Sequence, residues 1–320
     1  MGLSPDLFKR LSRLNRERLL TQLSTGEAAL PGTGEEPPTE PDEAALVLER
    51  VVPGRVAEAG GGRFYRVHRK AEDFRPGPEA AAAAEDAGVD GATVMARYRR
   101  TFFGAAIRRS AAALDEALRP LVACDPHRIT YLDIETCGLS GAPLFLVGLM
   151  RYRDDALEVE QFLARDYAEE RPVLAATRQV LAETQCLVTF NGKSFDVPFV
   201  AMRSVACGLF ERVEVPDHVD LLHASRRRWK RDLPNCRLQT LEQLICGRRR
   251  SGDIPGSDIP AAYHDFVRAC QPGTGPGFGG DDPLRRSRSL RRMQTILHHN
   301  ALDLVTMAEL VVHILAEGEA

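Results

Sequence analysis

The stretch ITYLDIETCGL, residues 129–139, has the composition of a buried strand but carries two carboxylates near its end. Most of its apolar residues are good strand formers, and side chains two positions apart in a strand point to the same face. Asp133 and Glu135 should therefore lie side by side. Like charges this close repel each other, and burying them unpaired is costly. Either a cation accompanies this pair, or the two carboxylates are solvated at an exposed strand end.

The chain around this stretch alternates between strand-like and helical patterns. Strand-like runs lie at 129–135, 144–152, 157–163 and 186–190. Helical runs lie near 169–184, 195–207, 238–247, 260–270 and 289–316. Strands come first and then mix with helices, which is typical of an α/β fold. We therefore expect residues 129–320 to form one domain, a mixed sheet with helices on both faces.

The first 128 residues lack any catalytic grouping and read as an N-terminal extension. Ser4 and Pro5 predict the start of a helix that ends near Leu20. Residues 24–43 are rich in Pro, Gly and Glu, which predicts a disordered linker. Further along, we expect a small hairpin, a loop and a helix, from runs near 45–52 and 63–68, residues 76–91, and residues 93–120.

Composition narrows the class of protein. The seven cysteines are scattered without a CxxC pair, which argues against a disulfide framework and for a reducing compartment. No window approaches the roughly eighteen consecutive apolar residues of a membrane helix, and the N-terminus lacks a secretory core. We therefore expect a cytoplasmic protein without a membrane segment.

Charge is unevenly distributed although the net charge of the chain is only −3. Residues 129–225 carry 8 basic and 15 acidic side chains, a net of −7, and residues 226–292 carry 15 and 7, a net of +8. An acidic cluster beside a basic segment is what a metal-dependent enzyme acting on a polyanion would need.

A second stretch, LVTFNGKSFDVPFV at residues 187–200, places another carboxylate at a strand end. Its apolar run stops at the turn signal Asn191-Gly192, and Asp196 falls in the first turn of the following helix. Asp is common at helix starts for electrostatic reasons alone, so this position has an ordinary explanation. However, a buried strand would deliver Asp196 to the carboxyl edge of the sheet, where open α/β sheets place their sites.

A third stretch, LHHNALDLVTMAELVVHIL at residues 297–315, reads as a helix with an apolar stripe. Asp303 follows His299 by four residues and so shares its face, whereas His298 is five residues away. Taken alone, the pair could simply support a surface helix. Together with the two earlier stretches, it supplies the fourth carboxylate of a set, Asp133, Glu135, Asp196 and Asp303.

Four carboxylates favour Mg²⁺ or Mn²⁺ over zinc as a ligand set. Two such ions would neutralise the close carboxylates, lower the pKa of an attacking water and stabilise a leaving oxygen in phosphoryl transfer. A histidine near that water could orient or deprotonate it.

The three stretches resemble the motifs of the DEDD exonucleases, members of the ribonuclease-H-like superfamily. Asp133-Ile134-Glu135-Thr136 resembles the first motif, Asn191 to Asp196 the second, and His299-Asn300-Ala301-Leu302-Asp303 the third. Residues 251–267, SGDIPGSDIPAAYHDFV, resemble a stretch typical of the stand-alone bacterial branch labelled YprB-type. The resemblance covers residues 128–316.

This resemblance implies a five-stranded mixed sheet, two divalent metal ions and removal of nucleotides from a 3′ end. It implies metal-ligand roles for Asp133, Glu135, Asp196 and Asp303. Family members carry either Tyr-x-x-x-Asp or His-x-x-x-x-Asp in the third motif. His299 fits the first spacing with His for Tyr and is our preferred base, and His298 fits the second and stays open as the alternative.

Several further residues are candidates for auxiliary or substrate-binding roles. Asp220 resembles an auxiliary acidic position of some relatives, although it could equally be an ordinary Asp at a helix start. Asn191 and Lys193 lie beside the second motif. In RRRWKR, residues 226–231, a base could stack on Trp229 while Arg227 and Arg228 hold phosphates. We expect the arginines of 248–250 to form a solvated face, and we assign no role to 285–292.

The sequence thus predicts an exonuclease that shortens single-stranded nucleic acid from its 3′ end. A structure-selective endonuclease on the same fold is one alternative, because the loop at 271–283 could block or admit an internal strand. A nucleic-acid-binding module without catalysis is another, although four intact carboxylates argue against it. DNA and RNA are not distinguished, since recognition of the 2′-hydroxyl leaves no clear motif.

Overall fold

A computed structural model describes residues 48–74, 91–104, 115–139, 141–211, 217–250, 252–270 and 283–316. The predicted helix at 4–20 and linker at 24–43 lie outside these residues, as do almost all of the predicted loops at 76–91 and 271–283. The division of the chain at residue 128 stays a prediction.

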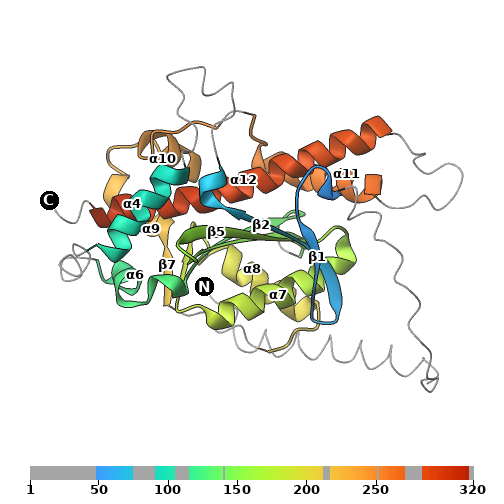
Figure 1. Cartoon of the computed structure of the whole chain (residues 1–320), viewed down its shortest axis with the longest axis horizontal. Coiled ribbons are helices and arrows are strands. Elements are labelled where there is room, and N and C mark those ends of the chain that lie inside the picture. Colours follow the sequence, from blue (N-terminus) through green and yellow to red (C-terminus); the bar gives the residue numbers. More distant parts are fainter. Residues whose placement is uncertain are drawn as a thin grey trace, which may run out of the picture.

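A seven-stranded mixed sheet forms the centre of the fold, in the order β1-β2-β5-β4-β3-β6-β7 (Figure 1). The pairs β3–β6 and β6–β7 are parallel and the other neighbours are antiparallel. The strands are Arg55–Ala59, Gly62–Lys70, Ile129–Thr136, Leu144–Arg153, Ala156–Leu163, Cys186–Thr189 and Asp217–Asp220, for β1 to β7. The predicted mixed α/β sheet is confirmed, with two strands more than the five that the resemblance implied.

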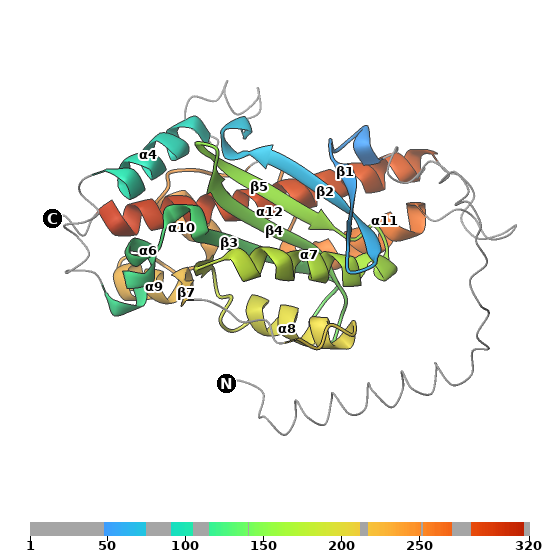
Figure 2. The same cartoon turned by 60° about the horizontal axis from the view of Figure 1, so that its bottom comes forward.

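The two extra strands form the predicted hairpin, which joins the edge of the central sheet. Gly60 and Gly61 adopt left-handed φ values of 56° and 78° at its turn, a conformation that favours glycine. β2 then pairs antiparallel with β5, so β1 lies at the outer edge (Figure 2). The first strand is Arg55–Ala59 and not the expected run at 45–52.

Helices cover both faces of the sheet (Figure 1). α7 (Glu170–Glu183) and α8 (Asp196–Ala206) lie on one face, and α12 (Pro283–Ala316) crosses the other. α4 (Gly91–Phe103) and α11 (Ile259–Cys270) pack against α12. The central strand β4 is accordingly buried in nine of its ten residues, which is why it reads as a continuous apolar run.

α12 is long and apolar enough to pass a composition test for a membrane span over Leu284–Ala316, but 83% of the qualifying window is buried inside the fold. A core helix passes the same test. α12 contacts the sheet and its neighbouring helices, so its apolar residues belong to the core of the fold.

The remaining short elements were only partly expected. Among the described residues, the other α-helices are α6 (Arg119–Ala123), α9 (Leu221–Trp229) and α10 (Leu238–Leu244). The helix predicted at 93–120 is instead α4, which ends at Phe103, and a 3₁₀ turn at Glu116–Leu118 that leads into α6. β7 was missed because its sequence, DHVD, is charged, and it is a strand only through its pairing with β6.

Candidate active site

The four predicted carboxylates come together from three elements. Asp133 and Glu135 lie on β3, Asp196 begins α8, and Asp303 lies on α12. Burial raises the pKa of Asp133 well above its ordinary value, and the nearby charges of Asp303, Glu135 and Asp196 raise it further. The carboxylates therefore form one cluster in which each opposes the ionisation of another.

The same two causes act on Glu135 and Asp196. Burial raises the pKa of Glu135 to about 8, with His299 opposing the shift and Asp303 and Asp196 adding to it. Burial also raises the pKa of Asp196 to about 7, although backbone hydrogen bonds partly oppose that rise. The cluster is short of positive charge, as the sequence of β3 indicated.

A tight turn between β6 and α8 delivers Asp196 to the cluster. Asn191 has a φ of 67°, and an added Cβ on Gly192 would lie only 2.4 Å from Oγ1 of Thr189. The buried carboxylate of Asp220 accepts hydrogen bonds from the backbone N–H groups of Asn191 (2.9 Å) and Lys193 (3.1 Å). It also caps α9 through the N–H of Leu222 at 3.0 Å. Asp220 thus shapes the turn, and its auxiliary role at the metal stays a prediction.

A row of paired residues across the sheet holds Asp133 in place. Asp133 pairs with Gly148 on β4, and Gly148 pairs with Gln161 on β5. Above Gly148 lies the fully buried Asn300, whose Nδ2 donates to Oδ2 of Asp133 at 2.8 Å. Its Oδ1 accepts from Nε2 of Gln161 at 2.8 Å. Asn300 therefore bridges the two outer residues of the row.

Glycine is required in the middle of this row. A Cβ on Gly148 would lie 2.1 Å from Oδ1 of Asn300, so any side chain there would displace the amide. The sequence pattern indicated no role for Gly148 or Gln161. The sequence offers only a weak signal, because Gln161 follows two other polar residues of β5, Glu158 and Glu160. A buried amide nevertheless needs partners.

The two histidines of the third motif differ in their surroundings. Nδ1 of the buried His299 lies 2.7 Å from Oδ1 of Asp253, and its Nε2 lies 3.5 Å from Oδ2 of Asp303. Burial lowers the pKa of His299, but the Asp253 hydrogen bond and the nearby carboxylates outweigh it, so the pKa is raised. His298 is exposed, and its ring centroid lies 6.1 Å from that of Phe74. His299 is therefore the histidine that faces the carboxylate cluster.

Asp253 is a site residue to which sequence analysis assigned no role. It lies in the 251–267 stretch and accepts from His299, which helps to hold its own pKa below the ordinary value although burial opposes this. Its Oδ1 also accepts from the N–H of Ile254 at 2.9 Å. Asp253 thus fixes the orientation of the imidazole, as a carboxylate partner of a functional histidine does.

The predicted solvated face at 248–250 is wrong for two of its three arginines. Arg248 is buried and pairs with Glu242 at 2.8 Å and with Glu309. The side chain of Arg250 is 6% exposed, and its guanidinium pairs with Glu242 at 2.6 Å and with Asp303 at 2.5 Å. The partners lie at distant positions of the chain, so the run of arginines alone could not reveal them. Arg250 supplies one positive charge at the edge of the carboxylate cluster.

The predicted base-stacking role of Trp229 is wrong. Its side chain is only 7% exposed, because it belongs to the apolar face of α9 that packs into the core. Arg227 pairs with Asp115 at 2.6 Å, and the guanidinium of Arg228 lies 5.9 Å from the centroid of the Trp229 ring. Asn191 and Lys193 are both exposed on the turn before Asp196, so their predicted contacts with substrate remain open to test.

The donor chemistry of the cluster suits a hard divalent cation, since carboxylate oxygens are the ligands that Mg²⁺ and Mn²⁺ prefer. Within the described ranges, no three His, Cys, Asp or Glu side chains stand in a metal-holding arrangement. Asp303 is engaged by Arg250 and His299 instead. The residue types fit a divalent ion, which at Asp303 would meet oxygens that face Arg250 and His299.

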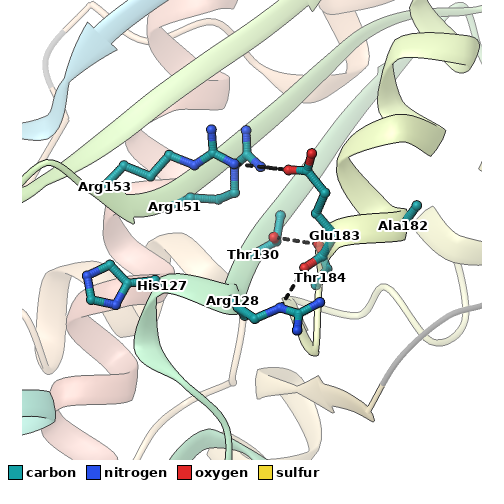
Figure 3. Close-up of a pocket in the computed structure, with 8 residues that line it drawn as sticks. All are labelled: His127, Arg128, Thr130, Arg151, Arg153, Ala182, Glu183 and Thr184. Atoms are coloured by element: carbon teal, nitrogen blue, oxygen red, sulfur yellow. Dashed lines mark hydrogen bonds and ion pairs between the residues drawn. The ribbon is translucent and has the colours of Figure 1, made fainter.

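A cavity of about 390 Å³ lies at the other end of β3, away from this cluster (Figure 3). Its arginines contact the carboxyl-terminal end of α7. Arg151 and Arg153 donate to the Glu183 carboxylate at 3.2 and 3.1 Å, and Nε of Arg128 donates to the Glu183 carbonyl. These contacts satisfy the carboxyl-terminal end of a helix, where cations are favoured. The cavity is lined by His127, Arg128, Thr130, Arg151, Arg153, Ala182, Glu183 and Thr184.

Comparison with known proteins finds both a sequence relative and a structural neighbour. The uncharacterized protein YprB of Bacillus subtilis (strain 168) is 32% identical over 206 residues, which cover 61% of this chain and 44% of that protein. The chain thus spans less than half the length of this relative. The family B DNA polymerase of the archaeon Pyrobaculum calidifontis is 18% identical, with a TM-score of 0.43 over 83% of this chain and 38% of that one.

A family model of the RNase_H superfamily matches residues 130–315, more than half of the chain. The matched range contains all four clustered carboxylates and both histidines of the third motif. The chain therefore belongs to the RNase H superfamily.

Proposed function

We propose that this protein is a metal-dependent 3′–5′ exonuclease that hydrolyses phosphodiester bonds of single-stranded nucleic acid. The observation that carries the proposal is the cluster of four carboxylates, Asp133, Glu135, Asp196 and Asp303, in which burial and neighbouring charge raise the pKa of the first three. Membership of the RNase H superfamily supports a nuclease. The 3′–5′ direction and the preference for single strands rest on the resemblance of the three motifs to the DEDD exonucleases.

The cluster is suited to hold two divalent ions, Mg²⁺ or Mn²⁺, on its four carboxylates. Bound there, the ions supply an acidified water and charge stabilisation of the leaving oxygen. Asn300 keeps one oxygen of Asp133 oriented by its 2.8 Å hydrogen bond. The turn shaped by Asp220 keeps Asp196 at the edge of the sheet.

His299 is the proposed base. Asp253 binds Nδ1 of the imidazole, which leaves Nε2 directed towards the carboxylate cluster and available to take a proton from an attacking water. His298, the alternative base, lies on the neighbouring face of α12 beside Phe74.

The side chains of Asn191 and Lys193 are exposed on the turn that precedes Asp196, and they are the proposed contacts to the substrate backbone. We also propose a cytoplasmic location, in keeping with the seven cysteines, all of which are free.

The test is degradation of 5′-labelled single-stranded DNA and RNA in Mg²⁺, Mn²⁺ or EDTA. Asp133→Asn removes one clustered carboxylate, and Asp232→Asn is the matched control because Asp232 is exposed on a turn after α9. The proposal predicts a ladder of products that shortens from the 3′ end and needs metal. This ladder should appear with the wild type and with Asp232→Asn, but not with Asp133→Asn. Cleavage of a circular single strand would favour the endonuclease instead. Binding without cleavage in either metal would favour an inactive binding module.

A further inference from the structure

Arg250 is a buried cation that touches the candidate metal site directly. Its Nε donates to Oε2 of Glu242 at 2.6 Å, and its Nη2 donates to Oδ1 of Asp303 at 2.5 Å. Its Nη1 lies 3.5 Å from Oδ2 of Asp253. A guanidinium shared among three carboxylates in a buried setting makes strong, charge-assisted hydrogen bonds.

Both oxygens of Asp303 are engaged in this arrangement. Oδ1 accepts from Arg250, and Oδ2 lies 3.5 Å from Nε2 of His299. A divalent ion needs at least one of these oxygens to bind Asp303, so the ion and the guanidinium compete for the same carboxylate. We propose that Arg250 is a displaceable guard on Asp303, which lowers the affinity of the site for divalent metal until the ion replaces the guanidinium.

Displacement from Asp303 would leave Arg250 anchored. Its contacts with Glu242 and Asp253 use Nε and Nη1, not the nitrogen that binds Asp303. Two residues away, Arg248 is held by Glu242, Glu309 and Thr306 on both sides of its guanidinium. The guard therefore moves as a side chain while the backbone of the 248–250 segment keeps its place. This inference rests on the proposed metal-dependent function.

The test is a calorimetric titration of the metal-free protein with Mn²⁺, which needs no substrate. Arg250→Lys keeps the positive charge near Glu242 but removes the planar fork that reaches Glu242 and Asp303 together. Asp133→Asn identifies the part of the binding that belongs to the carboxylate cluster. Arg249→Lys is the matched control, because Arg249 is the exposed neighbour of the two buried arginines.

We expect Arg250→Lys to bind Mn²⁺ about tenfold more tightly than the wild type, the effect of removing one charge-assisted competitor. Arg249→Lys should leave the affinity unchanged. If Arg250 acted only through its positive charge, Arg250→Lys would bind Mn²⁺ with the affinity of the wild type, because the lysine keeps that charge. Equal or weaker binding by this variant, with binding still lost in Asp133→Asn, would overturn the guard and leave the proposed function standing. Equal binding by wild type and Asp133→Asn would overturn the metal site itself.

A second measurement uses the unaltered protein, in case Arg250→Lys does not fold. In ¹⁵N-labelled protein, the side-chain N–H signals of Arg250 should show hindered rotation without metal, because three carboxylates hold the guanidinium. Saturating Mg²⁺ should shift these signals and speed the rotation, while those of Arg248 stay unchanged. Arg250 signals that do not respond to saturating Mg²⁺ would overturn the guard.

Discussion

At the residue scale, the carboxylate cluster carries an electrostatic cost to stability. Asp133, Glu135 and Asp196 all have raised pKa values because they are buried close to one another. Arg250 and Asn300 offset only part of that repulsion. A site that is destabilised without its ligand is common where activity demands it, so neutralising one member should stabilise the protein.

Asp133→Asn should therefore stabilise the metal-free protein by about 1 kcal/mol while it abolishes activity. An asparagine can still accept the hydrogen bond from Asn300 and no longer adds to the charge of the cluster. Urea unfolding in EDTA at neutral pH measures the change, with Asp232→Asn as the control. A destabilised Asp133→Asn protein would show that the carboxylate repulsion is not a cost to the fold.

Stability should also depend on pH through Glu135, whose pKa rises from an ordinary 4.5 to about 8 in the folded protein. Between these two values the folded state holds a proton that the unfolded state has lost. The folded state binds more protons, so the free energy of unfolding falls as pH rises through this window. Glu135→Gln should flatten the fall, as measured by urea unfolding in EDTA at several pH values. An unchanged slope in this variant would contradict the assignment.

Substitutions of the two histidines of the third motif should have different effects on kcat. His299→Gln should lower kcat by about 10² to 10⁴, the range for losing a general base. His298→Gln, the neighbouring control, should retain near-normal kcat because its ring contacts Phe74 and not the carboxylates. The reverse result would move the proposed base to His298.

At the scale of elements, the site depends on how three strands and α12 meet. The row Asp133, Gly148 and Gln161 crosses β3, β4 and β5, and Asn300 from α12 fits over its centre. The close approach of α12 to the sheet is possible only because Gly148 has no side chain.

Gly148→Ala should destabilise the protein by about 1–3 kcal/mol, the usual cost of overpacking a core. It should also lower activity, since a shifted Asn300 no longer orients Asp133. Gly256→Ala is the matched control, because a Cβ there meets nothing within 4 Å. Thermal unfolding and nuclease assays of both variants test this, and normal activity in Gly148→Ala would show that the Asn300 contact is dispensable.

At the scale of the whole molecule, elements from before residue 128 pack against the sheet and α12. β2 pairs with β5 at the sheet edge, and α4 packs on α12. Removing them would expose an unpaired strand edge and apolar residues of the core, both of which promote aggregation.

A chain that begins at residue 129 should therefore be insoluble or unfold without cooperativity, whereas one that begins at residue 48 keeps the hairpin and α4. Soluble yield and the sharpness of urea unfolding compare the two. A stable, cooperative protein from residue 129 onwards would show that the earlier residues are a separate extension.

The amino-acid sequence by itself determined the α/β class, the strand that carries Asp133 and Glu135, and the approximate limits of α7, α8, α11 and α12. These features depend on hydrophobic periodicity and on turn residues, both of which can be read from residues close together in the sequence. The carboxylates of Asp196 and Asp303 could also be singled out, because each follows a recognisable local motif.

Only the tertiary structure decided which side chains surround these carboxylates. Gly148, Gln161, Asp253 and Arg250 join the site through contacts between distant parts of the chain, and burial alone removed Trp229 from it. The charged strand β7 exists only because β6 offers it backbone partners. The physical reason is common to all of these cases: burial and pairing are set by which segments meet in space, and a local pattern does not contain that information.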